Sequence, residues 1–145
     1  EADQETAAVM CKAAGLDQEG RLDRTHIEKF PCEDLNTIDQ LWVTSSNGRF
    51  GVSVQKRIWE ELGGKVDYET ECRLGDRVGW RKNGKWLKYS DLKFTPKAIS
   101  GHLPSGIKVG WRRWGLWEPR SWWKGGACSL ASRLAECNRG KSRSR

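Results

Sequence analysis

The 145-residue sequence predicts a mainly α-helical domain with a long aromatic loop region and room for one short hairpin. Apolar residues recur at helical spacing in several segments, and glycine or proline stands at the ends of these segments. Three of the four prolines fall between residues 90 and 125, which makes that stretch the least regular. No apolar run approaches the roughly 20 residues that a transmembrane helix needs. These features favour a compact, soluble domain.

The first half of the chain contains most of the predicted helices. Residues 5–14 form a short helix with Gly15 as its C-terminal cap, and Asp23 caps a brief helical turn further on. Pro31 is expected as the first residue of the next helix. That helix presents an apolar stripe to the core, formed by Leu35, Ile38, Leu41 and Trp42.

A turn over residues 45–51 separates this helix from another that begins near Val52. In the second of these helices Val54, Ile58 and Leu62 recur every four residues, and Gly63 and Gly64 end it. The stretch YETECRLGD (68–76) is a further short helix or turn. The pair Asn83–Gly84 is a strong tight-turn signal, which suits either a small hairpin or a looped pair of helices.

The last predicted helix covers residues 129–137 and is amphipathic, with Leu130, Leu134 and Cys137 on its apolar face. The basic residues 139–145 form a tail that we expect to fray. The sequence therefore predicts a single domain over residues 1–138, and it contains no internal repeat.

Aromatic and basic residues are concentrated in the second half of the chain. Seven of the nine tryptophans lie there, and residues 72–145 carry 18 basic and 4 acidic side chains, against 8 and 15 in residues 1–71. Such a surface suits a partner that is flat, apolar and anionic. Two partners fit this description: a single-stranded nucleic acid, whose bases stack on aromatic rings, or a tetrapyrrole with two propionates.

The cysteines and histidines show no pattern of a metal centre. The chain has no C-x-x-C pair among its five cysteines, which are Cys11, Cys32, Cys72, Cys128 and Cys137. Its two histidines are too far away in the sequence to complete a zinc pattern with them. An odd number of unpatterned cysteines indicates reduced thiols in a cytosol-like compartment. No Ser-His-Asp or Cys-His arrangement is evident, so we expect a binding protein with no catalytic residues and no metal.

The stretch NGRFGVSVQKRIW (47–59) points to one of these partners. Its two glycines, Gly48 and Gly51, lack the spacing of a nucleotide-binding loop, and a helix rather than a buried strand precedes them. The segment RFGVSVQKRIW instead resembles the RFGFSVQ signature of the "genomes uncoupled" family of tetrapyrrole-binding proteins. The stretches FPCEDLNTIDQLWV, GDRVGWRKNGKWLKYSDLKF and GHLP occur in the order that this family shows, and the resemblance is strongest over residues 3–104.

The resemblance implies a nearly all-helical fold shaped like a cupped hand, in which mobile loops grip a flat tetrapyrrole. It also implies a role, because members of this family bind porphyrins and stimulate magnesium chelatase in organisms that make chlorophyll. The turn 47–51 and the loop from Trp80 to about Arg113 would line the cup. The chain departs from the family pattern at Val52, which replaces the second Phe of the motif, and in the sequence beyond Pro104.

The resemblance and the chemistry of a tetrapyrrole together nominate ligand-binding residues. Apolar side chains suit the disc, and Arg or Lys suits the propionates through charge-assisted hydrogen bonds. We expect the ligand to contact Phe50, Val52, Trp86, Phe94, Ile99, Leu103, Arg112 and Arg113. Further rim candidates are Arg81, Lys82, Lys97 and Lys108. Three tryptophans are expected mainly in the core, namely Trp42, Trp59 and Trp80.

One histidine lies within the GHLP motif. A histidine in a loop can ligate a metal at the centre of a tetrapyrrole, or it can hold a turn through hydrogen bonds to the backbone. We expect His102 to do the second, because Gly101 and Pro104 on either side of it fit a fixed turn.

The sequence thus predicts a non-catalytic tetrapyrrole-binding module without a covalently bound cofactor. The expected ligand is protoporphyrin IX, magnesium protoporphyrin IX or a related bilin, and the large subunit of magnesium chelatase is the candidate protein partner. We expect the protein in the cytoplasm of a photosynthetic prokaryote or in the chloroplast stroma. Two alternatives stay open: binding of single-stranded nucleic acid, and a protein-interaction module that has kept the fold but lost the ligand.

Overall fold

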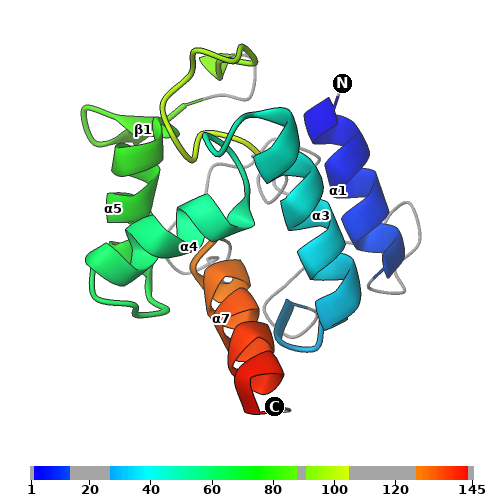
Figure 1. The fold of residues 1–145 in the computed structure, drawn as a ribbon. Coiled ribbons are helices and arrows are strands. Elements are labelled where there is room, and N and C mark those ends of the chain that lie inside the picture. The colour runs from blue at the N-terminus through cyan, green and yellow to red at the C-terminus, as the bar shows by residue number, and fades with distance from the viewer. Residues whose placement is uncertain (1, 14–26, 88–90, 105–126, 144–145) are drawn as a thin grey trace.

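The computed structural model describes residues 2–13, 27–87, 91–104 and 127–143, and within these ranges the chain is mainly helical, as predicted. Figure 1 shows a small antiparallel hairpin beside the helices. The helices are α1 (Ala2–Ala13), α3 (Cys32–Ser45), α4 (Val52–Glu61), α5 (Tyr68–Val78) and α7 (Ala127–Arg143), and the strands are β1 (Arg81–Lys82) and β2 (Lys85–Trp86). None of the helices in these ranges is long and apolar enough to cross a membrane.

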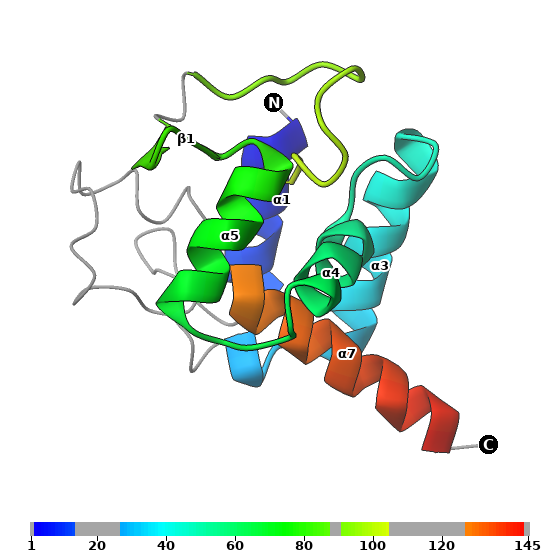
Figure 2. The same ribbon diagram turned by 90° about the vertical axis from the view of Figure 1, so that its left-hand side faces the viewer.

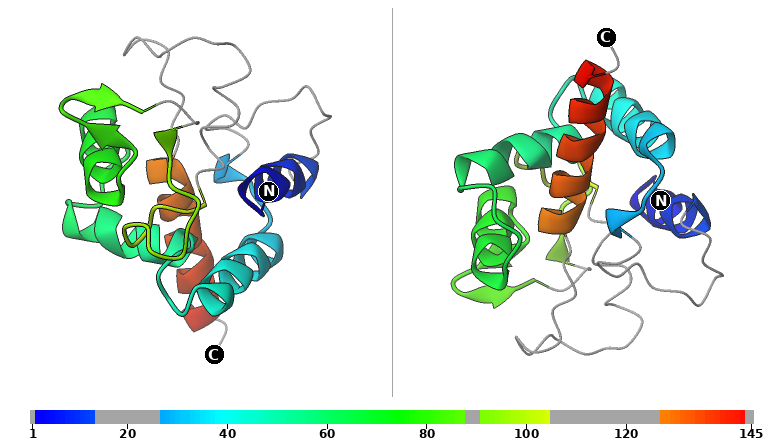
Figure 3. Two further views of the ribbon diagram at one scale, coloured as in Figure 1. Left: turned by 90° about the horizontal axis from the view of Figure 1, so that it is seen from above. Right: turned by 90° about the horizontal axis from the view of Figure 1, so that it is seen from below.

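Helix α7 holds the domain together. It packs most extensively on α4 and also contacts α3 and α5. Figures 1 and 2 show α7 crossing beneath α4, and the view from below in Figure 3 shows α5 on one side of α7 and α3 on the other. The loop 91–104 lies on the opposite side of the molecule from α7, above α4 (Figure 1).

The core consists of two main clusters of buried apolar side chains that share α4 and α7. The cluster between α4, α5 and α7 contains Ile58, Trp59, Leu74, Val78, Trp80, Leu92, Ala127, Cys128 and Ala131. The cluster between α1, α3, α4 and α7 contains Met10, Ile27, Phe30, Leu35, Ile38, Val52, Leu130 and Leu134. Trp59 and Trp80 are therefore core residues, as predicted, and Trp42 is partly buried against the second cluster.

Helix α3 differs from the prediction in two details. It begins at Cys32, so Pro31 is the N-cap residue rather than the first helical residue. Its buried face includes Leu35, Ile38 and Asp39, whereas Leu41 is 64% exposed, so the prediction that Leu41 packs in the core is wrong. The physical reason is that α3 turns Asp39 inward to α4, where its Oδ1 accepts a hydrogen bond from the Ser53 N–H at 2.7 Å.

The turn before α4 depends on glycine. Gly51 is the N-cap of α4 and has a φ of 132°. A Cβ atom at this position would lie 2.8 Å from Asp39 Oδ1 and 2.8 Å from Val43 Cγ2. The glycine therefore allows α3 and the start of α4 to approach each other closely. At its other end α4 stops at Glu61, before Gly63 and Gly64, as predicted.

The structure decides between two pairs of alternatives that the sequence left open after α4: a helix or a turn over residues 68–76, and a hairpin or a pair of helices around Asn83–Gly84. Residues 68–76 lie within helix α5, which begins after the N-cap Asp67 and ends at Gly79 in the left-handed conformation. Residues 81–86 form the hairpin rather than a pair of helices, with Arg81 opposite Trp86 and Lys82 opposite Lys85. Asn83 and Gly84 occupy its turn with φ values of 53° and 78°, as the turn signal predicts.

Helix α7 is longer than predicted. It begins at Ala127 and runs to Arg143, so it continues into the residues that were expected to fray. Its start is held by α5, because the buried carboxylate of Glu71 accepts the N–H groups of Ala127 at 3.0 Å and Cys128 at 2.9 Å. These are N–H groups that lack acceptors within a helix, so Glu71 caps α7 from a distance in the sequence.

The prediction of reduced cysteines is wrong for two of the five. Cys32 at the start of α3 and Cys137 of α7 form a disulfide, while Cys72 and Cys128 are free thiols. The two bonded residues are 105 positions apart in the sequence. Only the packing of α3 against α7 brings them together, so their spacing gave no signal. The disulfide also removes the basis for inferring a cytosol-like compartment from the cysteines.

Candidate functional site

The loop 91–104 is held by the motif RFGVSVQ through hydrogen bonds to its backbone. The Arg49 guanidinium donates to the Ala98 carbonyl at 3.0 Å, and the Arg49 carbonyl accepts from the Gly101 N–H at 2.8 Å. The Gly51 N–H donates to the Leu103 carbonyl at 3.0 Å. We call Arg49, Gly51 and Gln55 the clasp of the loop.

Gln55 is the buried member of the clasp. Its side chain is 2% exposed, and its Nε2 donates to the carbonyls of Gly101 at 2.9 Å and Pro104 at 3.0 Å. One amide group thus fixes both sides of the GHLP turn. Because buried carbonyls without donors cost stability, this pairing makes the loop position specific.

His102 holds the same turn from the other side. Its Nδ1 lies 2.7 Å from the Val78 carbonyl, and its Nε2 lies 2.9 Å from the Lys93 N–H. Since a carbonyl accepts and an N–H donates, the two contacts fit the tautomer that carries its proton on Nδ1. Both ring nitrogens are therefore used, and His102 is 3% exposed. This confirms the prediction that His102 holds a turn.

Phe50 packs against two residues of the loop itself, Ala98 and Leu103. All three side chains are buried, and Trp42 packs against the small cluster that they form. The rings of Trp42 and Phe50 meet edge to face with their centres 6.3 Å apart. Phe50, set at the centre of the motif, thus supports the underside of the loop.

Two predicted ligand-binding residues are on the outer side of the loop. Phe94 is 44% exposed and Ile99 is 55% exposed. Ile99 lies over the end of α5, because a Cβ atom on Gly79 would be 3.2 Å from its Cδ1. The loop therefore presents apolar side chains to solvent while its backbone is tied down.

Trp86 reaches the same helix from the hairpin. A Cβ atom on Gly75 would lie 2.7 Å from the Trp86 ring, so the ring packs directly on the backbone of α5. Gly75 and Gly79 are four residues apart, which corresponds to about one helical turn. The two glycines thus allow Trp86 to pack on the last turns of α5 and Ile99 to pack on its C-cap, although Trp86 and Ile99 come from different segments of the chain.

The predicted rim cations near the loop 91–104 differ in whether they form ion pairs. The Arg81 guanidinium pairs with the Asp76 carboxylate at 3.2 Å and is partly buried. Lys82 and Lys97 are exposed and have no ion pair within the described residues. The other predicted rim residues, Lys108, Arg112 and Arg113, lie outside the described ranges.

The predicted ligand-binding residues thus fall into three groups. Trp86, Phe94 and Ile99 are partly or largely exposed around the loop and α5, whereas Phe50 and the loop residue Leu103 are buried against each other. Val52 is fully buried in the cluster between α1, α3, α4 and α7. Sequence reasoning missed Arg49 and Gln55, although both are polar residues inside the quoted motif.

The chemistry open to the described part of the site depends on its potential metal ligands and its thiols. Within the described residues no three His, Cys, Asp or Glu side chains converge to hold a metal ion. The free thiol of Cys128 is buried in the first turn of α7, and this burial, together with the nearby Glu71 carboxylate, raises the pKa of the thiol far above its usual range. A thiol of this kind is not a nucleophile at neutral pH.

Sequence comparison identifies relatives of this chain. The model of a protein family described as GUN4-like matches residues 1–120 of this chain. The Ycf53-like protein of Synechocystis is 37% identical over 106 residues, which cover 71% of this chain and 43% of the relative. The chloroplastic tetrapyrrole-binding protein of Arabidopsis thaliana is 34% identical over 84 residues, which cover 57% of this chain and 30% of the relative. The chain spans less than half the length of these curated relatives.

Solved structures give a consistent result. The structure of GUN4 from Chlamydomonas reinhardtii matches with a TM-score of 0.63 and 25% identity, covering 92% of this chain and 74% of that chain. The ligand-free structure of Arabidopsis thaliana GUN4 matches with a TM-score of 0.57 and 25% identity, covering 74% of this chain and 78% of that chain. These matches confirm the mainly helical fold and the family resemblance of the motifs.

Proposed function

This chain belongs to the GUN4-like family, and on that premise we propose that it is a non-catalytic tetrapyrrole-binding module. The observation that carries the proposal is the loop 91–104, which exposes Phe94 and Ile99 while the clasp and His102 hold its backbone. A surface of apolar side chains on a fixed backbone loses little conformational freedom when it binds a rigid disc. The name of the Arabidopsis relative, a tetrapyrrole-binding protein, supports the same ligand class.

The chemistry of the loop suits a tetrapyrrole. Phe94, Ile99 and Trp86 provide apolar contacts for the disc, whose burial gains about 25 cal/mol per Å². Lys97 and Lys82 are exposed cations without ion pairs in the described ranges, and they can meet a propionate. Arg112 and Arg113 remain proposed partners of the same carboxylates. Binding requires no axial ligand from His102, whose two ring nitrogens are occupied by the backbone.

We further propose protoporphyrin IX or magnesium protoporphyrin IX as the ligand, with a related bilin as the variant of the same class. The module would act as an accessory of magnesium chelatase, or as a tetrapyrrole sensor within a longer chain. It would work in the cytoplasm of a photosynthetic prokaryote or in the chloroplast stroma. Cyanobacterial and chloroplast relatives support this setting.

A fluorescence titration tests the binding proposal. Deuteroporphyrin and its magnesium form are added to the whole chain, and quenching of its tryptophans is measured. Phe94→Ala and Ile99→Ala should each raise Kd about five-fold, since each removes about 1 kcal/mol of apolar contact. Val9→Ala is the matched control, because Val9 is 45% exposed on α1 and should leave Kd unchanged. Absence of saturable quenching in the wild-type chain would refute tetrapyrrole binding.

The rim residues need a separate comparison. Arg113→Ala should weaken binding of deuteroporphyrin and spare its dimethyl ester, because the ester lacks the carboxylates that an arginine recognises. Equal losses for both ligands would show that Arg113 does not meet a propionate. An excess of single-stranded oligonucleotide should not displace the porphyrin, and displacement would favour the nucleic-acid alternative.

A further inference from the structure

An open groove runs along the outer face of α3, and its lining residues include none from the loop 91–104. It has a volume of about 640 Å³, and residues of one α3 face line it from Glu33 to Ser45. Leu41 lies in the middle of this face and is 64% exposed. The polar side chains that line the groove include the amides of Asn36 and Gln40 and the hydroxyl of Thr37. The groove therefore combines a central apolar residue with neutral hydrogen-bonding groups.

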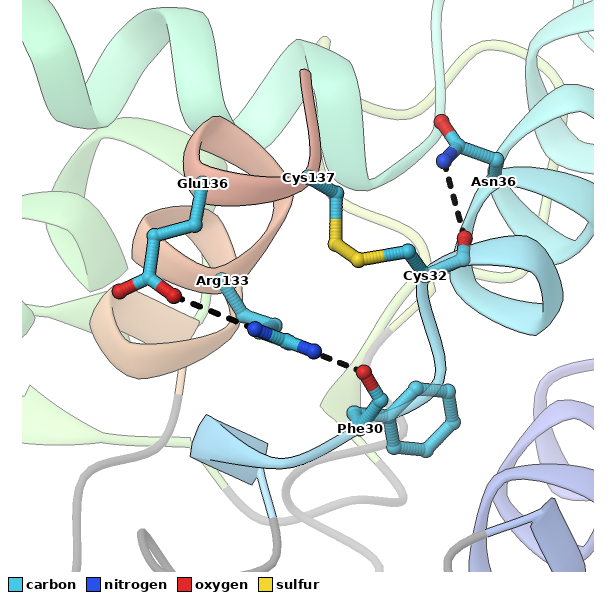
Figure 4. Close-up of a disulfide and its surroundings, with 6 residues drawn as sticks. All are labelled: Phe30, Cys32, Asn36, Arg133, Glu136 and Cys137. Atoms are coloured by element: carbon cyan, nitrogen blue, oxygen red, sulfur yellow. Dashed lines mark hydrogen bonds and ion pairs between the residues drawn. A yellow bond between two sulfur atoms is a disulfide. The ribbon is translucent and has the colours of Figure 1, made fainter. Parts of the chain in front are cut away.

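The disulfide forms one end of this groove. Both Cys32 and Cys137 line it, and Cys32 is the more exposed of the two. Figure 4 shows the disulfide bridging the first turn of α3 and α7, with the Arg133 side chain reaching from α7 to the Phe30 carbonyl on the same side. A disulfide that opens onto a surface groove differs from one sealed in a core, because thiol–disulfide exchange needs access for the attacking thiolate.

We propose that this groove docks a dithiol oxidoreductase, which reduces the Cys32–Cys137 disulfide. Leu41 lies nine residues further along α3, roughly 13 Å from Cys32 along the helix axis, and would contact an apolar residue of the oxidoreductase surface away from its catalytic cysteine. Among the described residues that line the groove, Glu33 is the one that carries a charge, so a neutral or basic surface around the catalytic cysteine fits best. This proposal does not depend on tetrapyrrole binding, since the groove and the loop 91–104 are separate.

The reaction balances as a two-step exchange. The thiolate of the oxidoreductase attacks Cys32 Sγ, the S–S bond of this chain breaks, and Cys137 leaves as a thiolate that takes up a proton. The second thiolate of the oxidoreductase then attacks the sulfur of the first oxidoreductase cysteine in the mixed disulfide. Cys32 leaves as a thiolate and takes up a proton. The oxidoreductase ends as a disulfide and this chain ends with two thiols, so two electrons and two protons have been transferred.

The reduced chain keeps most of its contacts between α7 and the rest of the domain. Leu130 and Leu134 of α7 remain in the core, and Arg133 still donates to the Phe30 carbonyl at 2.9 Å. Glu71 still caps the start of α7. What is lost is the covalent bond between the first turn of α3 and the later half of α7. Reduction therefore removes the covalent link at one end of α7, and these non-covalent contacts remain to hold the helix.

The test uses the whole oxidised chain and a thioredoxin with its NADPH-dependent reductase. Free thiols are counted over time with a maleimide-polyethylene glycol reagent. We expect two thiols to appear at least ten-fold faster than with glutathione at the same thiol concentration. Leu41→Glu should slow the enzymatic reaction several-fold and leave reduction by dithiothreitol unchanged. Val9→Glu is the matched control on α1 and should change neither rate.

A trapping experiment identifies the sulfur that is attacked. A thioredoxin that lacks its resolving cysteine should form a mixed disulfide with Cys32, identified by mass spectrometry of tryptic peptides. A mixed disulfide on any other cysteine would overturn the proposed reaction. An enzymatic rate that Leu41→Glu does not alter would overturn the docking site, and so would a rate no faster than that of glutathione. A chain that gains no thiols on reduction would overturn the proposal at its first step.

Discussion

Trp86 packs its ring on Gly75, at a distance that leaves no room for a side chain. A Cβ atom on this glycine would lie 2.7 Å from two carbons of the ring. In the interior of an exposed helix, replacing glycine by alanine ordinarily stabilises by about 1 kcal/mol. Here steric overlap opposes that gain, because both the helix backbone and the hairpin are held by neighbouring contacts.

The first prediction concerns this contact. Gly75→Ala should destabilise the domain by about 1–3 kcal/mol, the range for an overpacked site. When Trp86 is already replaced by Ala, adding Gly75→Ala should cost much less stability than it does in the wild type, because the ring that the new methyl group would meet is gone. Urea unfolding of the wild type, both single variants and the double variant gives the coupling energy. A coupling near zero would contradict the close contact.

The second prediction concerns the clasp. Gln55→Met keeps the size of the buried side chain and removes the donor to the Gly101 and Pro104 carbonyls. We expect a loss of about 2 kcal/mol in the free energy of unfolding, the cost of leaving buried acceptors unpaired. Hydrogen exchange should rise at Ala98, Gly101 and His102, whose N–H groups are bonded in the loop. Unchanged exchange at these amides would show that Gln55 does not hold the loop.

The third prediction concerns the cap of α7. Glu71→Gln replaces one of the two oxygens that accept N–H groups by an NH₂ group, which cannot accept them. The variant should lose about 1–3 kcal/mol of stability. Glu69→Gln is the matched control, because Glu69 lies exposed in the same first turn of α5. Equal stabilities of the two variants, measured by urea unfolding, would contradict the capping role.

The fourth prediction concerns pH. Hydrogen bonds from the Thr70 side chain and its backbone N–H hold the pKa of Asp67 below its ordinary value. Because the pKa is lower in the folded than in the unfolded state, the ionised carboxylate stabilises the fold above the unfolded pKa, and this contribution is lost as pH falls through the folded pKa. Asp67→Asn keeps an N-cap residue but removes the titration.

The stability of the wild type should therefore fall relative to Asp67→Asn as pH decreases from about 5 to about 2. Urea unfolding at a series of pH values measures this difference. A difference between the two proteins that stays constant over this range would show that Asp67 has the same pKa in both states. The effect is expected to be small, since Asp67 lies at the surface of the domain.

Much of the fold can be predicted from the sequence because its signals are local. The period of Val54 and Ile58 indicates α4, the pair Gly63–Gly64 marks its end, and Asn83–Gly84 marks the hairpin turn. These features depend on backbone preferences of residues next to each other in the chain. The motif RFGVSVQ likewise identifies the family, and the family match confirms that prediction.

The errors arise where a residue's role depends on a distant segment. Leu41 fits the apolar stripe of α3, yet the orientation of this helix is set by the contact of Asp39 with α4, which leaves Leu41 exposed. Cys32 and Cys137 are paired only because α3 packs against α7. Neither relationship has a signature in the local sequence.

The same division applies to the candidate site. The sequence by itself determined that the chain is helical, that its motif belongs to this family, and that Phe94 and Ile99 are candidates for ligand contact. Only the tertiary structure decided that Val52 is core, that Phe50 supports the loop from below, and that Arg49 and Gln55 hold its backbone. Helical periodicity is encoded between near neighbours, whereas burial and hydrogen-bond partners are set by packing between segments that lie far apart in the chain.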